Sequence, residues 1–169
     1  MMTERQVRIG FLARTNFSRL KADGFLAGLS AVIGRQIAAD SLLPIDKSDQ
    51  YRSMFSNGYR GSRDGERNSY RSFQSAGGFG ALEEKATRLS SRVGAEPAIL
   101  LPTHFEQCVR VTVGELLSRP KSMLEFDRDT LGLASLDGES GFMLDWNPDD
   151  SEWTFELAIW GEHWVGDLM

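Results

Sequence analysis

The residues that could do chemistry are few, and most of them lie in the middle of the chain. His104 precedes Cys108 by four residues, a spacing that would place an imidazole and a thiol on one face of a helix. Free cysteine is, however, commonly a small buried apolar side chain. Ser140 lies in a Gly-Glu-Ser-Gly run, which lacks the Gly-x-Ser-x-Gly spacing of a serine hydrolase. The sequence therefore predicts no catalytic residue.

Metal and phosphate sites have no stronger support. His104, Glu106 and Cys108 would line one face of a strand, and the Glu162-His163 pair could join them from far away in sequence. Nothing in the spacing fixes that geometry. A Gly-Gly-Phe-Gly run at 77–80 lacks the Lys-Ser/Thr of a phosphate-binding loop and is better explained as a joint. We expect no bound metal and no cofactor.

Charge separates the end of the chain from the rest. Residues 1–120 hold 17 Lys/Arg and 12 Asp/Glu, whereas residues 121–169 hold 2 Lys/Arg and 12 Asp/Glu. After Arg128 ten acids follow without a single Lys or Arg. A surface of one sign accelerates capture of an oppositely charged partner. The pattern indicates a basic protein partner, and it disfavours nucleic acid because nucleic acid is itself a polyanion.

The acidic tail has the pattern of an antiparallel β-meander. Asp137-Gly138 is a typical two-residue hairpin turn. Such a turn places Leu133 opposite Phe142, and the neighbouring inward pair is also apolar. A second turn at 147–152 then pairs Trp146 with Trp153. The first turn also sets Leu131 opposite Leu144, and the second sets Leu144 opposite Phe155 and Phe142 opposite Leu157.

The opposite face of this sheet is the expected partner-binding surface. It mixes acids with Trp160, and tryptophan is over-represented at the centres of protein interfaces. We expect the binding residues to be Asp145, Asp149, Asp150, Glu152, Glu156, Trp160, Glu162 and Trp164. A fourth strand, Met123 to Asp127, could precede the meander.

Shorter patterns place the remaining elements. Residues 5–12 alternate and predict a strand, and Asp23 is a good N-cap for a helix that ends near Asp40. Residues 80–93 have a helical apolar face, and 97–101 is a short apolar strand. Thr112 and Glu115 fit a capping box that opens a short helix, Val113 to Arg119.

Residues 46–80 predict a long mobile loop rather than an element, apart from one short helix around Gln50 to Ser56. The segment holds seven Ser, six Gly and five Arg, together with all three tyrosines. Loops of this length in compact domains are commonly functional. Two alternatives follow. The loop could close the site of a small enzyme or ligand-binding protein, or its Arg/Tyr side chains could hold a single-stranded nucleic acid.

These patterns together predict a single α+β domain over residues 1–169, with a β-meander of three to four strands packed against two or three helices. A chain of this length buries a sizeable core unaided. No stretch approaches the roughly 20 apolar residues that span a bilayer. The lone cysteine and the absence of a signal-peptide pattern favour the cytoplasm.

The closing stretch has a further implication. The run Gly141 to Trp146, the Asp/Asn turn and the run Trp153 to Gly161 resemble the immunity proteins of bacterial polymorphic and contact-dependent toxin systems. The resemblance implies a non-enzymatic cytoplasmic antidote that occludes a toxin, often a basic nuclease. These families share no site motif, so the resemblance assigns no residue. A non-enzymatic protein-binding module is thus favoured over an enzyme.

Overall fold

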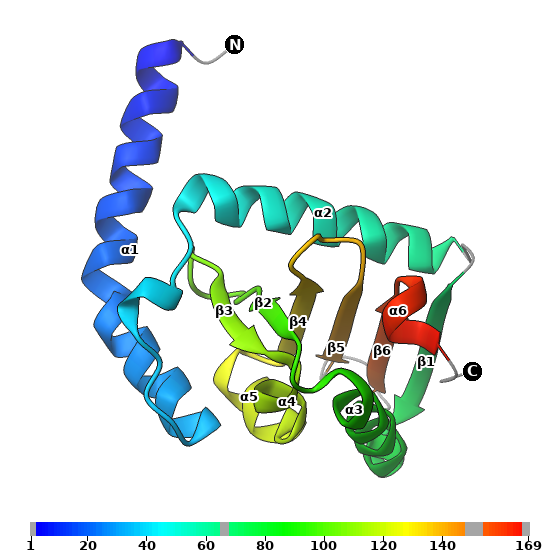
Figure 1. Cartoon of the computed structure of the whole chain (residues 1–169). Coiled ribbons are helices and arrows are strands. Elements are labelled where there is room, and N and C mark those ends of the chain that lie inside the picture. The colour runs from blue at the N-terminus through cyan, green and yellow to red at the C-terminus, as the bar shows by residue number, and fades with distance from the viewer. Residues whose placement is uncertain (1–2, 65–67, 148–153, 167–169) are drawn as a thin grey trace.

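The protein has an α+β fold built on one antiparallel sheet (Figure 1). The computed structural model describes residues 3–64, 68–147 and 154–166. Its strands are β1 (Ser69–Ser75), β2 (Pro97–Leu100), β3 (Val109–Thr112), β4 (Thr130–Ser135), β5 (Gly141–Asn147) and β6 (Thr154–Trp160). Its helices are α1 (Glu4–Ile33), α2 (Ile45–Arg63), α3 (Phe79–Val93), α4 (Val113–Leu117), α5 (Pro120–Phe126) and α6 (Glu162–Val165). Two short 3-10 turns, Ala39–Ser41 and Ala76–Gly78, complete the described elements.

The sheet confirms the predicted meander and extends it on both sides. The strand order is β1-β6-β5-β4-β2-β3, and every neighbouring pair is antiparallel. The first hairpin has the predicted register, with Leu133 opposite Phe142 and Leu131 opposite Leu144. Strand β1 from the segment predicted to be a loop adds one edge, and the β2–β3 pair adds the other.

The second hairpin has a different register from the prediction. Trp146 pairs with Phe155 rather than Trp153, so Leu144 faces Leu157 and Phe142 faces Ile159. The shift is two residues. Because side chains alternate with period two, a shift of two leaves every side chain on the face that was predicted. Trp153 itself lies outside the described residues.

The predicted apolar face forms the main core. Leu131, Leu133, Phe142 and Leu144 are fully or almost fully buried, and they pack against helices α3, α4 and α5. Helix α3 is the predicted amphipathic helix. Its buried side chains are the four expected ones: Leu82, Ala86, Leu89 and Val93. The Thr112–Glu115 capping box also forms, and it opens α4.

The predicted outer face is not a surface, because α2 covers it (Figure 1). The prediction of a mobile loop at 46–80 is therefore wrong. Its described part forms α2 and β1, with a 3-10 turn after them. Phe55 and Tyr59 of α2 pack on Met143, Ala158 and Trp160 of the sheet. A helix this polar gains its stability from packing rather than from its own propensity.

The N-terminal prediction is also wrong. Residues 5–12 are helical, and α1 runs from Glu4 through Asp23 without interruption. Its N-cap is Thr3, whose hydroxyl accepts from the Gln6 backbone while the Gln6 side chain accepts from Thr3, a complete capping box. The helix ends earlier than predicted, at Gly34, which has a φ of +83°.

The expected strand at Met123 to Asp127 is a helix instead. Pro120 stands in the first turn of α5, where its missing N–H is no loss and its fixed φ suits the helix. Phe126 packs against Gly28 of α1, where a Cβ would lie 2.9 Å from the Phe126 ring. This contact joins α1 to the body of the molecule.

Two glycines provide a matched test of how α1 and α2 are packed. A Cβ at Gly58 of α2 would overlap the buried indole of Trp160, whereas a Cβ at Gly24 of α1 would meet open space. We expect Gly58→Ala to lower the free energy of unfolding by about 1–3 kcal/mol through overpacking. Gly24→Ala should raise it by about 0.5–1 kcal/mol through helix propensity. Urea denaturation checks both values, and equal effects at the two positions would contradict this packing.

Candidate functional site

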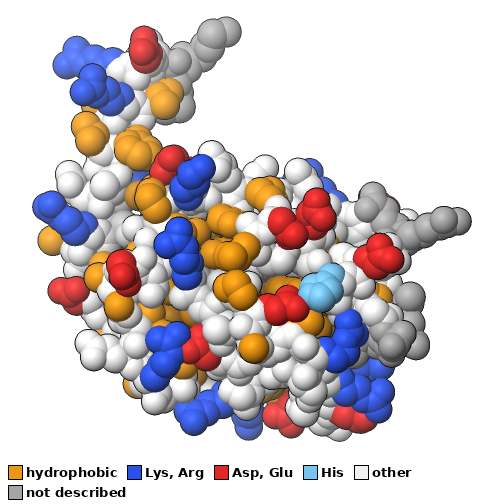
Figure 2. Space-filling model, in the orientation of Figure 1, with side chains coloured by type: hydrophobic (Ala, Val, Ile, Leu, Met, Phe, Trp, Pro, Cys, Tyr) orange, Lys and Arg blue, Asp and Glu red, His pale blue; other side chains and the backbone are white. Residues whose placement is uncertain are grey.

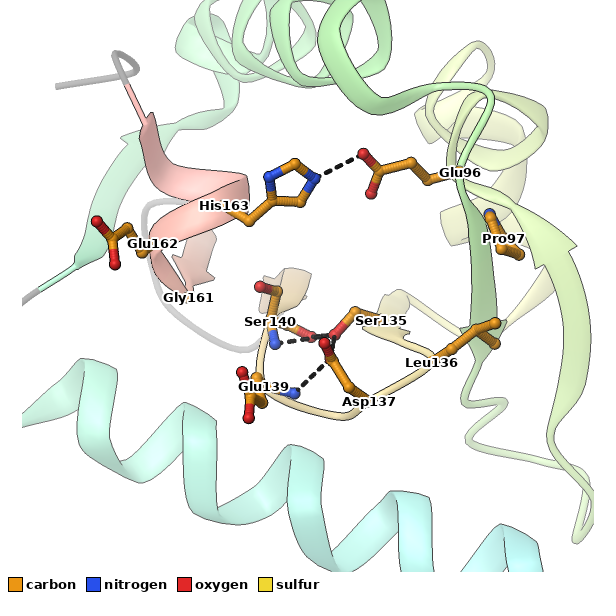
Figure 3. A pocket seen from close by; sticks show the side chains of 10 residues that line it. All are labelled: Glu96, Pro97, Ser135, Leu136, Asp137, Glu139, Ser140, Gly161, Glu162 and His163. Carbon is orange, nitrogen blue, oxygen red and sulfur yellow. Dashed lines mark hydrogen bonds and ion pairs between the residues drawn. The ribbon is translucent and has the colours of Figure 1, made fainter.

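A hollow lined by several acids lies at one end of the sheet, beside the β4–β5 turn (Figure 3). It has a volume of about 840 Å³. Three parts of the chain line it: the start of β2, the β4–β5 turn and the start of α6. The lining residues are Glu96, Pro97, Ser135, Leu136, Asp137, Glu139, Ser140, Gly161, Glu162 and His163. We call this hollow the acidic pocket, because four of these residues are carboxylates and none is Lys or Arg.

Strand register explains why these distant segments meet. Ala98 of β2 pairs with Ser135 of β4, so the start of β2 lies beside the β4–β5 turn. Gly141 of β5 pairs with Trp160 of β6, so the residues after β6 lie beside the same turn. Antiparallel pairing thus carries Glu96, Asp137 and Glu162 to one end of the sheet, although they are far apart in sequence.

The turn itself is held rigidly. Gly138 has a φ of +75°, the left-handed conformation that the predicted turn requires. The Ser135 hydroxyl donates to Asp137 Oδ1 at 2.5 Å and accepts from the Ser140 N–H at 2.9 Å. From below, the Tyr51 hydroxyl of α2 donates to the Leu136 carbonyl at 2.6 Å. The pocket floor is therefore fixed before any partner arrives.

Asp137 is the carboxylate that the structure holds ionised most clearly. The Ser135 hydroxyl and the Glu139 N–H both donate to its Oδ1, the latter at 3.0 Å. These bonds lower the pKa of Asp137 below its ordinary value, against a smaller opposing effect of burial. Asp137 therefore stays ionised to a lower pH than an ordinary aspartate.

His163 and Glu96 form the opposite wall. His163 Nε2 lies 2.6 Å from Glu96 Oε1 across the pocket (Figure 3). Arg92 of α3 fixes the helix that carries His163, because its guanidinium donates to the His163 carbonyl at 2.7 Å. Gly161, the residue before α6, has a φ of +89°, and a Cβ there would overlap Ser140. A side chain at 161 would push the two walls apart.

The structure brings only one of the predicted binding residues into this pocket, namely Glu162. Trp160 is 5% exposed under α2, and Trp164 is fully buried in the main core, so the expectation that they lie on a binding surface is wrong. The physical reason is that the sheet is covered by helices on both faces. Asp149, Asp150 and Glu152 lie outside the described residues.

The two other predicted acids are used inside the molecule. Glu156 Oε1 accepts from the Tyr59 hydroxyl at 3.0 Å and from Arg71 Nε at 2.6 Å. Burial, followed by Glu156, raises the pKa of Tyr59. Asp145 Oδ1 accepts from the Thr130 hydroxyl at 2.6 Å. The Glu156 contacts join β6 to α2 and to β1, and the Asp145 contact joins β5 to β4.

A second, smaller hollow lies on the far side of α2. It has a volume of about 350 Å³, and Arg14, Arg52 and His104 are among its lining residues. His104 Nδ1 lies 2.6 Å from Asp127 Oδ1, and the Thr103 N–H donates to both Asp127 oxygens at 2.9 and 3.0 Å. Asp127 is fully buried. We call this the His104 pocket.

His104 and Cys108 do not combine as the spacing allowed. Cys108 is buried in a separate apolar cluster with Leu43 and Ile99. Burial raises the pKa of its thiol, the opposite of what an activated nucleophile needs. In the described part of the chain, no group of three or more His, Cys, Asp or Glu is arranged to hold a metal ion.

Sequence reasoning missed Glu96, Asp137 and Glu139 as site residues, although it identified the turn that holds two of them. No helix among the described residues is both long and apolar enough to cross a membrane. No family model, curated protein or solved structure matches this chain. The pocket geometry and the charge are therefore the grounds on which a function is proposed.

Proposed function

We propose that the protein is a non-enzymatic binding module whose acidic pocket receives Lys or Arg side chains of a protein partner. The observation that carries the proposal is the convergence of four carboxylates, without a Lys or Arg, in one concave site. A concave surface of one sign concentrates the field and speeds encounter with a cationic surface. An immunity protein that neutralises a basic toxin is the form of this function that the resemblance of the C-terminal stretch favours.

The fixed walls of the pocket support this reading. Binding loses less free energy to ordering when the recognising groups are already positioned. Asp137 is held by two hydrogen bonds and Glu96 faces His163, so both carboxylates are oriented in the free protein. Glu139 and Glu162 are exposed at the pocket rim, where they can meet an arriving cation.

Charge reversal at the rim tests the proposal. The probe is an arginine-rich peptide titrated by calorimetry at low salt. We expect Glu139→Lys with Glu162→Lys to weaken its binding at least roughly tenfold, about 1.4 kcal/mol. The fold should persist, because both side chains are exposed.

The matched control is Glu83→Lys with Glu125→Lys. It changes the net charge equally at exposed positions of α3 and α5, away from the pocket. Its effect on peptide affinity should be small and should vanish as salt screens long-range attraction. Equal weakening by the two double variants would show that net charge, and not the pocket, binds the peptide.

A specific observation favours a second candidate function, a small-molecule or enzyme site in the His104 pocket. The buried Asp127 carboxylate orients His104, an arrangement that acid–base catalysis uses. Arg52 comes from the segment that was expected to close such a site. However, Arg52 also donates to the carbonyls of Pro102 and Phe105 at 2.8 and 2.7 Å, which gives it a structural role.

The nucleic-acid alternative has less support from the packing. Tyr59 and Arg71 are bonded to Glu156, and the Tyr51 hydroxyl is bonded to the Leu136 carbonyl. Side chains committed to internal contacts offer little for the stacking and phosphate contacts that single strands require.

A further inference from the structure

Residues 4–20 of α1 form an arm whose tip projects beyond the body of the molecule, while Arg14 and the buried Ser18 hold the lower part of the arm against the body (Figures 1 and 2). Its large apolar side chains are in water. Six of them are between 43% and 82% exposed: Val7, Ile9, Phe11, Leu12, Phe17 and Leu20. Exposed apolar side chains that gather on one segment commonly mark a protein or membrane interaction site. The arm therefore has the composition of an interface.

The distribution of these side chains decides between a membrane and a protein as the occupant. A helix that lies in a membrane surface has its apolar side chains on one face. At 100° per residue, Val7 and Phe11 share one face, whereas Ile9, Leu12 and Leu20 lie on other faces of the same helix. An arm that is apolar nearly all round needs a partner that contacts it from more than one side.

A groove of about 570 Å³ lies at the root of the arm. Ala22 of α1 and Leu42, Pro44 and Ile45 at the start of α2 give it apolar walls. Phe11 lines its upper end. The groove and the arm thus have matching chemistry, but a helix cannot fold back into a groove at its own root. The occupant must come from another molecule.

Charge completes the match. The tip of the arm carries Glu4, Arg5 and Arg8, a net charge of +1, whereas the groove is lined by Arg19, Asp23 and Asp46, a net charge of −1. Arg5 lies 18 residues from Asp23 in α1, about 27 Å along the helix, so the arginines of the tip cannot reach these acids within one molecule, whereas an antiparallel arm brings them there. The middle of the arm, Arg14, is already neutralised within each molecule.

The neutralisation of Arg14 matters because two identical antiparallel arms are related by a two-fold axis at their centre. Arg14 donates to Asp49 at 2.9 and 3.0 Å and to Glu106 at 2.7 and 3.0 Å. Two arginines facing each other at the centre of an antiparallel pair would otherwise repel. We propose that the arm binds a second copy of this chain, so that two α1 arms pair antiparallel and each tip occupies the groove at the root of the other. Such a contact is isologous and closes at two copies.

Solution mass across a dilution series of the full chain, by light scattering after size exclusion, tests this proposal. The wild type should give twice the 18.9 kDa of the chain. Val7→Glu with Ile9→Glu should give the single-chain mass. The control, Phe73→Glu, should stay dimeric, because it introduces an acid at an equally exposed apolar residue outside α1.

Charge exchange tests the register at low salt. Arg5→Glu with Arg8→Glu should dissociate the dimer, and so should Asp23→Lys with Asp46→Lys. The chain that combines all four changes should dimerise again. A wild type that is monomeric throughout, or dimeric with arm variants that stay dimeric, would overturn the proposal. So would a monomer whose arm binds anionic lipid vesicles.

Discussion

Trp160→Ala should lower the free energy of unfolding by about 3–5 kcal/mol, as expected for removing a buried tryptophan. The indole is 5% exposed, with the Phe55 ring 4.9 Å away edge-on and the Tyr59 ring beyond it. Its loss would leave a cavity between α2 and the sheet. Since domains of this size are stable by about 5–15 kcal/mol, the variant should unfold at far lower denaturant.

Trp160→Phe serves as the control for this prediction. It keeps an aromatic ring beside Phe55 and removes the Trp160 Nε1–H, which has no hydrogen-bond partner among the described residues. We expect it to lose less than half as much stability as the alanine variant, by denaturant titration. If Trp160→Ala were nearly neutral for stability yet abolished peptide binding, Trp160 would have to be a surface residue after all.

Asp127→Ala should lower the free energy of unfolding by about 1.5–3 kcal/mol, because it removes a buried carboxylate that accepts several hydrogen bonds. The Thr103 N–H, the Thr103 hydroxyl and His104 Nδ1 all contact Asp127. Together these bonds hold the segment between β2 and β3. Urea denaturation would measure the loss of stability, and near-ultraviolet circular dichroism would report any loss of tertiary packing.

The pH dependence of this position has a definite sign. Burial raises the pKa of the Asp127 carboxyl, and the bonds from Thr103 and His104 oppose that effect only in part. A folded pKa above the unfolded value near 3.9 makes a stabilising contribution below that value and loses it as pH rises through the folded pKa. The wild type should therefore lose stability relative to Asp127→Asn as pH rises above the unfolded value near 3.9. A difference that is independent of pH would contradict the raised pKa.

The parts of the fold that the sequence predicts correctly are specified by local patterns. The Asp137-Gly138 turn fixes the register of the first hairpin, and Thr112 with Glu115 caps a helix. The second hairpin was misjudged by two residues because its turn has no comparable signal. The faces predicted for its side chains are nevertheless correct, because a register shift by an even number of residues leaves each side chain on the same face of the sheet.

The errors occur where distant contacts determine local structure. Within residues 45–63 the sequence predicted only a short helix around Gln50 to Ser56, yet the whole segment forms α2, and Gly58 lets this helix approach Trp160. That helix hides the face expected to bind a partner. In α1, the alternation of Val7, Ile9 and Phe11 resembles a strand, and the overlooked Thr3–Gln6 capping box was the better signal.

The candidate site could be predicted only in part, for a related reason. The charge asymmetry indicated an acidic surface near the C-terminus, and Glu162 belongs to it. Glu96 precedes Glu162 by 66 residues in sequence. It reaches the pocket because β2 pairs with β4, an arrangement that only the strand order reveals.

The most direct test of the central claim is to map the arginine-rich peptide by amide chemical shifts on the isotope-labelled protein. If the peptide binds in the acidic pocket, the largest shifts should fall in three separate segments: around Glu96, from Ser135 to Ser140, and from Gly161 to His163. These shifts should saturate together and be absent in Glu139→Lys with Glu162→Lys. Shifts that centre instead on the His104 pocket, or that spread evenly over exposed acids such as Glu83 and Glu125, would contradict the proposed site.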